Sequence, residues 1–176
     1  MQYKEFKDGI RRSRLGMGVM RLPVVGQDDA VIDYKKAKEV IDLCMQSGIN
    51  YYDTAYIYHG GKSEEFIGKA LAGYSRESYY VADKFNLQAN ADYQAQLSEQ
   101  LKRLCMDYID FYLLHGIQDN FADSMLDSGC ISYFDRMKQQ GKNTLSRFFF
   151  SWKSWKTHGN YKSISVGFCT DSVKLL

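Results

Sequence analysis

The stretch that decides the fold is INYYDTAYIYHGGKSEEFIGKAL, residues 49–71. It begins with a short apolar run that ends in Asp53, and a glycine-containing loop with Tyr58 follows. A helix then starts: Ser63 is the expected N-cap, two glutamates occupy the first turn, and apolar residues recur on one face. If the fold is a ring of parallel strands, Asp53 and Tyr58 both point into the mouth where such folds keep their chemistry.

The composition fits about one globular domain. The chain has 176 residues, of which 45% are hydrophobic and 15% aromatic, as in ordinary soluble proteins. A net charge of +2 argues against nucleic acid or an anionic membrane as the main partner. No apolar run reaches the roughly 18 residues of a membrane span, and the start, MQYKEFKDGIRRSRLG, lacks the apolar core of a signal peptide. We therefore expect a cytoplasmic protein.

The cysteines are widely scattered and form no C-x-x-C pair. They are Cys44, Cys105, Cys130 and Cys169. This spacing predicts neither a disulfide framework nor a metal site, and we interpret the cysteines as buried reduced thiols.

Strand-like and helix-like segments alternate over most of the chain. The opening KEFKDGIRRSRL, residues 4–15, has a hairpin pattern around Asp8-Gly9. Four strands are expected within RLGMGVMRL (14–22), INYYD (49–53), SYYVADKFN (78–86) and DYIDFYLLHG (107–116), with a helix after each. The connections are too long for hairpins, so the pattern predicts a parallel α/β architecture.

Three consecutive expected strands end in a chemically capable residue, namely Asp53, Lys84 and His115. Taken singly, a lysine at a strand end is usually solvated and a histidine is usually a hydrogen-bonded structural residue. In a parallel barrel, however, the carboxyl ends of the strands gather at one face. Together with Tyr58, these residues therefore predict a single site.

Four ordered motifs together resemble the aldo-keto reductase family. They are SRLGMGVMRLP (13–23), GINYYDTAYIYHGGKSEEFIGKAL (48–71), VADKFN (81–86) and DYIDFYLLHG (107–116). They are most similar to a bacterial branch whose longer members have an iron–sulfur segment near the C-terminus, which we expect to be absent here. The resemblance covers residues 1–142 and implies the N-terminal half of a (β/α)8 TIM barrel, with strands 1–4 and a hairpin at its bottom.

The resemblance implies reduction of a small-molecule carbonyl (an aldehyde, ketone or quinone) by NADPH or NADH. By matching motif, the family's catalytic residues fall on Asp53, Tyr58, Lys84 and His115. Hydride addition leaves an alkoxide that needs a proton, and a tyrosine, with a pKa of about 10 in water, is a poor acid unless its anion is stabilised. Lys84 would supply positive charge, Asp53 would hold Lys84, and His115 would orient the carbonyl and help share the proton.

The resemblance also implies contacts with the cofactor. Gly18, Val19 and Met20 match the first cofactor-contacting strand end of the family, and Asp53 is a further cofactor-binding residue. Asp83, just before Lys84, departs from the small residue usual in the family. His59 has no family role, and we expect it to be a solvated loop histidine. No metal ligand is implied, and the motifs specify neither the substrate nor the oligomeric state.

The resemblance stops after Lys142. Residues 143–176 have five basic residues and one acidic residue, and read NTLSRFFFSWKSWKTHGNYKSISVGFCTDSVKLL where the family leads us to expect IRYLGFSFHG. One back-translation of residues 141–151, with one A removed from its A-run, encodes GKIRYLGFSF. We therefore interpret residues 143–176 as out of frame, through a gene error or a sequencing error. The alternative is a natural divergent segment, whose FFFSWKSWK suggests a membrane-surface or nucleic-acid patch but lacks clean helical periodicity.

The length bears on activity. A closed barrel of this kind takes about 250 residues, and four strands with at most a poor fifth do not close it. We therefore expect the catalytic residues to be present without most of the cofactor contacts, and the chain to be weakly active or inactive. The alternative is a non-enzymatic remnant or interaction fragment.

Overall fold

The computed structural model describes residues 1–6, 9–115, 128–139, 148–150 and 174–175. Within these ranges the strands are β1 (Tyr3–Phe6), β2 (Ile10–Ser13), β3 (Leu15–Gly18), β4 (Tyr51–Asp53), β5 (Tyr80–Phe85), β6 (Phe111–Leu114), β7 (Phe148–Phe150) and β8 (Lys174–Leu175). The α-helices are α1 (Tyr34–Gln46), α2 (Lys62–Leu71), α3 (Tyr93–Leu104) and α5 (Cys130–Gln139), with short 3-10 turns η2 (Tyr58–Gly61) and η3 (Arg76–Ser78).

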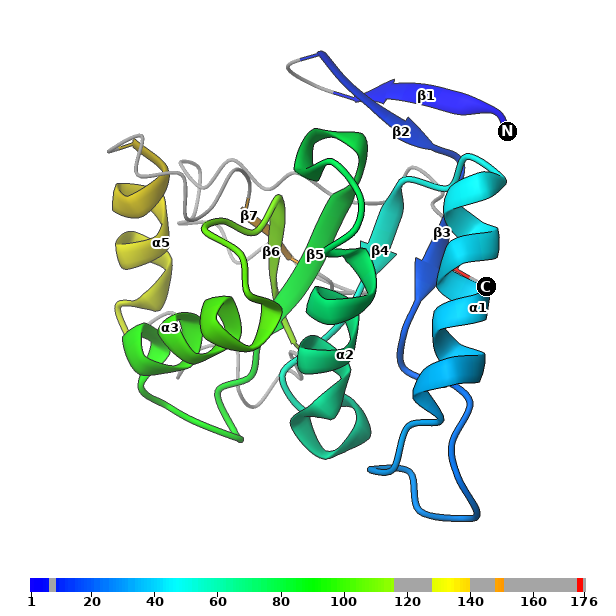
Figure 1. Ribbon diagram of the computed structural model, residues 1–176. Coiled ribbons are helices and arrows are strands. Elements are labelled where there is room, and N and C mark those ends of the chain that lie inside the picture. Colours follow the sequence, from blue (N-terminus) through cyan, green and yellow to red (C-terminus); the bar gives the residue numbers. More distant parts are fainter. Residues whose placement is uncertain (7–8, 116–127, 140–147, 151–173, 176) are drawn as a thin grey trace.

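The main sheet is parallel, with strand order β7-β6-β5-β4-β3-β8. Figure 1 shows α1, α2, α3 and α5 following one another along one side of this sheet. The predicted N-terminal half of a barrel, with four consecutive parallel strands, is confirmed. The short strands β7 and β8 extend its two edges. They belong to residues 143–176, which we interpret as out of frame, and the rest of that segment lies outside the described residues.

The hairpin of β1 and β2 marks the amino ends of the strands. The two strands are antiparallel, and a single residue separates the end of β2 from the start of β3. Asn50, just before β4, accepts a hydrogen bond from the Ser13 N–H (2.7 Å) and donates to the Arg11 carbonyl (3.0 Å). The hairpin therefore lies at the end of the sheet opposite the carboxyl ends, as the sequence predicts.

Helix α1 shows how local sequence sets the helix layer. Asp33 caps it by accepting a hydrogen bond from the Lys36 N–H (3.2 Å), and Ala37, Ile41 and Cys44 bury one face against the sheet. The chain leaves the helix through Gly48, whose φ of +82° is a conformation that favours glycine.

Helix α2 begins differently from the prediction. Its N-cap is Gly61, with a left-handed φ of +86°, so the expected N-cap role of Ser63 is wrong. The Ser63 hydroxyl is instead buried, paired with the Thr54 hydroxyl (2.8 Å) and donating to the Val19 carbonyl (3.3 Å). Ser63 thus links the segments that follow β3 and β4. Its hydroxyl is available for this, because Gly61 turns the chain into the helix without a side-chain cap.

The cysteines depart from expectation at one position. Cys44 and Cys130 are buried, as expected, whereas Cys105 is exposed. Cys105 ends α3 in a left-handed conformation, with φ +53°, which turns it away from the core. Cys169 lies outside the described residues.

The two faces of the sheet are both buried. Between sheet and helices lies the main apolar core, whose fully buried members include Ile41, Ile67, Leu71, Leu104 and Phe134. The opposite face has a smaller cluster of Tyr51, Ala82, Phe111 and Leu113. Because side chains on a strand alternate, residues that follow this smaller cluster by two positions continue the same face.

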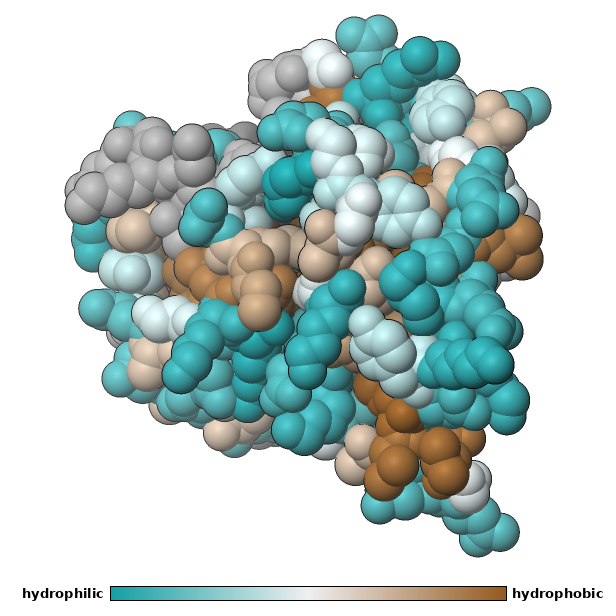
Figure 2. Space-filling view, in the orientation of Figure 1, coloured by the Kyte–Doolittle hydropathy of each residue, from teal (hydrophilic) through white to brown (hydrophobic). Residues whose placement is uncertain are grey.

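The outer surface over the helices is mainly hydrophilic, as Figure 2 shows. An apolar patch lies over the loop between β3 and α1, where Val25 and Val31 are 58% and 46% exposed. This loop leaves the carboxyl end of β3. Across the described ranges, no helix combines the length and the apolar character needed to cross a membrane.

We expect Gly68→Ala to destabilise the protein. Gly68 lies where α2 meets α3, and a Cβ there would lie 2.2 Å from the Leu104 carbonyl oxygen, a backbone atom that cannot move aside alone. Overpacking of this kind costs about 1–3 kcal/mol of the free energy of unfolding. Urea unfolding measures it, and Gly73→Ala is the control, because a Cβ at Gly73 meets nothing within 4 Å. Equal stability of the two variants would contradict the close helix packing.

Candidate active site

The carboxyl ends of β3, β4, β5 and β6 place the predicted residues at one edge of the sheet. Gly18 lies beside Asp53 in the parallel register of β3 and β4. Asp53, Lys84 and His115 each follow a member of the smaller apolar cluster by two positions, so alternation directs them to that same face. His115 comes directly after β6, and its N–H donates to the Phe85 carbonyl (2.8 Å).

Lys84 is the centre of this group and is only 8% exposed. Its Nζ donates to Asp53 Oδ1 (2.6 Å) and to the Thr54 carbonyl (2.6 Å). Burial lowers the pKa of Lys84, but the charge of Asp53 and its hydrogen bond, with a contribution from Tyr58, outweigh burial, so the pKa is raised overall. Lys84 is therefore a buried ammonium at neutral pH.

Tyr58 contacts both Lys84 and His115. The Lys84 Nζ lies 4.9 Å from the centre of the Tyr58 ring. The rings of Tyr58 and His115 meet edge to face, with centroids 5.8 Å apart and an interplanar angle of 86°. The loop after β4 thus brings the phenol to the same place as the residues at the ends of β5 and β6.

His115 is an uncharged imidazole at neutral pH. Burial lowers its pKa, the nearby Lys84 charge lowers it further, and Asp53 only partly opposes them. Its Nδ1 is buried and has no hydrogen-bond partner among the described residues. A polar group of a bound molecule could satisfy this nitrogen.

The predicted cofactor-binding strand end has three different environments. The side chain of Val19 is fully buried in the core, and its N–H donates to the Asp53 carbonyl (2.9 Å). Gly18 is half-buried beside Asp53, and Met20 is 53% exposed. Gly18, the exposed Met20 and the unpartnered His115 nitrogen are therefore the groups near Asp53 that a bound molecule could contact.

The prediction that His59 is solvated is wrong. His59 is 1% exposed, its Nδ1 donates to the Asp29 carbonyl (2.6 Å), and its Nε2 accepts from the Leu22 N–H (3.1 Å). Its φ of +51° turns the ring inward directly after Tyr58. His59 therefore fastens the Tyr58 loop to the loop that follows β3. The signal for this turn was the Gly-Gly pair after it, which indicates a left-handed segment.

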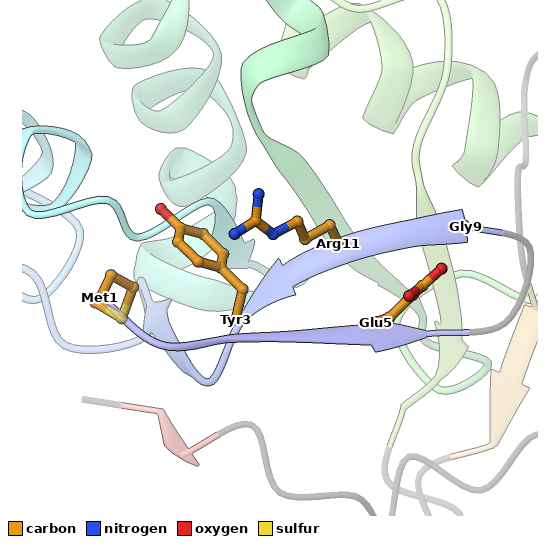
Figure 3. Close-up of a pocket in the computed structure, with 5 residues that line it drawn as sticks. All are labelled: Met1, Tyr3, Glu5, Gly9 and Arg11. Atoms are coloured by element: carbon orange, nitrogen blue, oxygen red, sulfur yellow. The ribbon is translucent and has the colours of Figure 1, made fainter.

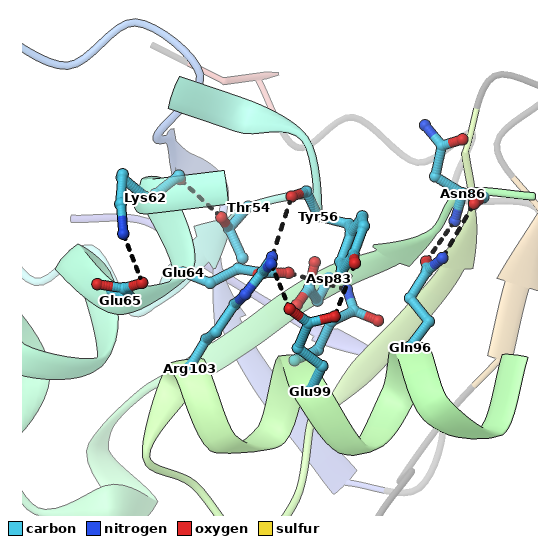
Figure 4. Close-up of polar contacts among 12 residues, drawn as sticks. Thr54, Tyr56, Lys62, Glu64, Glu65, Asp83, Asn86, Gln96, Glu99 and Arg103 are labelled. Atoms are coloured by element: carbon cyan, nitrogen blue, oxygen red, sulfur yellow. Dashed lines mark hydrogen bonds and ion pairs between the residues drawn. The ribbon is translucent and has the colours of Figure 1, made fainter. Parts of the chain in front are cut away.

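A polar layer behind the site, in which Glu64 is fully buried and Glu99 and Arg103 are partly exposed, was not anticipated (Figure 4). Arg103 donates to Glu64 Oε2 (2.8 Å), to Glu99 Oε1 (2.5 Å) and to the Tyr56 carbonyl (3.4 Å). The Tyr56 hydroxyl donates to Glu99 Oε2 (2.7 Å), and the Arg103 guanidinium lies 4.5 Å from the centre of the Tyr56 ring. The sequence signal was the position of Glu64 on the same helix face as Ile67 and Leu71.

A shallow pocket lies elsewhere, on the β1–β2 hairpin (Figure 3). Its volume is about 490 Å³, and it is lined by Met1, Tyr3, Glu5, Gly9 and Arg11. The Arg11 guanidinium lies 4.7 Å from the centre of the Tyr3 ring. Because the hairpin is at the amino ends of the strands, this pocket is separate from the candidate site.

Comparison with known proteins gives consistent matches. The model of the Aldo/keto reductase family matches residues 14–145. The uncharacterized oxidoreductase YqkF of Bacillus subtilis is 31% identical over 143 residues, which cover 73% of this chain and 42% of that protein. Methylglyoxal reductase DkgA of Escherichia coli O157:H7 is 35% identical over 114 residues, which cover 63% of this chain and 36% of that protein.

The fold comparison agrees. The holo form of aldo-keto reductase AKR11C1 from Bacillus halodurans superimposes with a TM-score of 0.70 at 30% identity, covering 86% of this chain and 50% of that one. The chain spans less than half the length of the two curated relatives described above. From the matched residues and the half-barrel they form, the chain belongs to the aldo/keto reductase family.

Proposed function

We propose that this chain contains the proton-donating part of an NAD(P)H-dependent carbonyl reductase site, with Tyr58 as the general acid. The observation that supports it best is the contact of one tyrosine with a buried ammonium and an uncharged imidazole. The Lys84 Nζ lies 4.9 Å from the Tyr58 ring centre, and the His115 ring centroid lies 5.8 Å from that of Tyr58.

The proposed chemistry follows from these environments. Bound NADPH or NADH would supply the hydride, and the residues of this chain handle the proton. Tyr58 gives its hydroxyl proton to the alkoxide oxygen, and the Lys84 ammonium stabilises the phenolate that remains. Asp53 keeps Lys84 charged and in place through its 2.6 Å ion pair. His115 orients the carbonyl oxygen and helps share the proton.

The cofactor contacts in this chain are incomplete. Gly18 and Met20, with Asp53, would contact the nicotinamide end, and Val19 between them would hold this strand end in place through its buried side chain. The chain spans 42% of one relative and 36% of another, and we propose that further cofactor contacts of the family belong to the part of those relatives that it does not match. We infer that the chain binds cofactor weakly and turns over slowly or not at all, because positioning supplies a large part of the barrier reduction.

The domain division remains part of the proposal. We propose that residues 1–142 are the N-terminal part of the reductase barrel and that residues 143–176 are not family sequence, having been read out of frame. The family match ends at residue 145, which supports a boundary there. The proposed substrate is a small carbonyl compound, and the name of the methylglyoxal reductase relative supports that class. We propose a cytoplasmic location.

A second candidate is a non-enzymatic remnant or interaction fragment that keeps the first half of the fold. The share of its relatives that the chain spans favours it. Quenching of protein fluorescence by NADPH at micromolar concentration would favour the reductase. An absence of quenching would favour the non-enzymatic remnant.

We expect restoration of the reading frame to create activity. The 176-residue chain should show little turnover of simple aldehydes or quinones with NADPH, because it cannot position the cofactor. The longer chain, encoded after one A is removed from the codons for Lys142 and Asn143, should reduce them. Steady-state absorbance of NADPH measures both. Equal turnover by the two chains would show that the residues encoded in the restored frame are not needed for activity.

In the longer chain, Tyr58→Phe should lower turnover by about 10²–10⁴-fold, because phenylalanine keeps the ring and lacks the transferable proton. The matched control is Tyr56→Phe, two residues earlier, whose hydroxyl bonds to Glu99 in the polar layer. Tyr56→Phe should retain most of the turnover. If both variants behave alike, or if Tyr58→Phe is fully active, Tyr58 is not the acid.

A further inference from the structure

Asp83 is a completely buried carboxyl group that the proposed mechanism does not use. It precedes Lys84 on β5, so alternation directs it to the opposite face of the sheet, toward α2 and α3. Its Oδ1 accepts a hydrogen bond from the Lys84 N–H (2.7 Å). Its Oδ2 is equally buried and receives no hydrogen bond from any described residue.

The group that faces Asp83 is a second buried carboxyl, Glu64 of α2, which is also fully buried. Glu64 Oε1 accepts from Gln100 Nε2 (3.0 Å), and Oε2 accepts from Arg103 (2.8 Å). Glu64 thus has a cation on one oxygen and an amide donor on the other, whereas Asp83 Oδ2 has neither among the described residues.

Other groups around Asp83 do not replace that cation. Lys84 follows it in the chain, but the Lys84 ammonium is committed to Asp53 and the Thr54 carbonyl on the other face. From β6, Tyr112 donates its hydroxyl to Gln100 Oε1, and it lies near both carboxyls. Among the described residues, the cation bound to this pair is Arg103, which contacts Glu64 and is shared with Glu99.

Two carboxylates cannot both be charged here at low cost. Like charges in a buried pair repel strongly, and a buried charge without a partner is expensive. Burial first, and then the charge of Glu64, raise the pKa of Asp83 well above its usual value, against the weaker opposing effect of the Lys84 N–H. The oxygen without a donor, Oδ2, is the natural location for the proton.

We propose that Asp83 keeps a proton at neutral pH, shares it with Glu64, and thereby acts as a positioning residue for Lys84. The backbone of Lys84 is held on both sides: Asp83 accepts from its N–H, and Gln100 donates to its carbonyl (3.2 Å). Both of these residues contact Glu64. Through Arg103, Glu64 is also tied to the carbonyl of Tyr56, two residues before Tyr58.

The shared proton thus completes a hydrogen-bonded connection between the strand that presents Lys84 and the loop that presents Tyr58. Only the catalytic meaning of this connection rests on the proposed function. The proton itself is a property of the folded chain, and the experiments below detect it without turnover.

The test uses Asp83→Asn, in which an amide keeps the acceptor for the Lys84 N–H and offers a fixed N–H to Glu64. When the pKa of a carboxyl group is raised in the folded state, the protein loses folding stability as the pH rises above the pKa of that group in the unfolded chain. Between the usual aspartate range and the raised pKa, the folding equilibrium constant of the wild type should fall by up to about tenfold per pH unit relative to Asp83→Asn. Urea unfolding between pH 5 and pH 8 measures this ratio.

Asp110→Asn is the matched control. Asp110 is also a buried aspartate whose pKa is raised by burial, but its Oδ2 accepts from Arg76 (2.5 Å) and from the Val81 N–H (2.8 Å), and both contacts oppose that rise. Its replacement should lower stability at neutral pH, because Arg76 loses its anion. Infrared spectra at pH 7 should show the carbonyl band of a protonated carboxylic acid in the wild type and in Asp110→Asn, and its loss in Asp83→Asn.

The positioning role has its own readout. The Lys84 amide should resist hydrogen exchange in the wild type and in Asp83→Asn, and should exchange faster in Asp83→Ala, which lacks the acceptor. A wild type without the acid band, or a stability difference for Asp83→Asn that does not change with pH, would overturn the shared proton. Equal exchange of the Lys84 amide in Asp83→Asn and a folded Asp83→Ala would overturn the positioning role. If these readouts hold while the longer chain shows no turnover, only the proposed function fails.

Discussion

The buried ammonium of Lys84 is the constraint on which the rest of the site depends. A charged group inside a protein must be paired and hydrogen-bonded, because burial otherwise favours its uncharged form or destabilises the fold. Here Asp53 and the Thr54 carbonyl, both at the end of β4, supply the partners at 2.6 Å. The ion pair therefore requires the parallel register in which Asp53 lies beside Ala82, two residues before Lys84 on the same face. Removal of Asp53 or of Lys84 leaves the charge of the other residue uncompensated.

Strand β5 places a buried polar side chain on each face of the sheet, an ammonium on one face and a carboxyl group on the other. On the inner face, β5 presents the ammonium toward Asp53, Tyr58 and His115. On the outer face, the preceding residue, Asp83, lies in a polar layer between sheet and helices where the helix packing is otherwise apolar. A one-residue shift of β5 would exchange these two side chains, so the polar partners on both faces specify the register. Burial of polar groups behind the site thus fixes the strand that presents the ammonium.

Sequence reasoning reached the parts of the structure that depend on local pattern. Alternating strands and helices predicted the parallel half-barrel, and strand ends predicted that Asp53, Lys84 and His115 lie at one edge. It failed where tertiary contacts decide. A glycine in a left-handed conformation displaced the expected Ser63 cap, and a buried hydrogen-bond pair took His59 out of solvent. The sequence indicates Glu64 only as a first-turn acid and Asp83 only as a departure from the family pattern, because their partners come from α3 and from each other.

The central claim is that Asp53 keeps Lys84 charged inside the protein, and ¹⁵N-detected NMR titration of the Lys84 side-chain nitrogen tests it directly. In the wild type the pKa of Lys84 should lie above its usual value. In Asp53→Asn, burial acts without the opposing carboxylate, and the pKa should fall below the usual value. A Lys84 pKa below the usual value in the wild type, or one that Asp53→Asn does not change, would contradict the account.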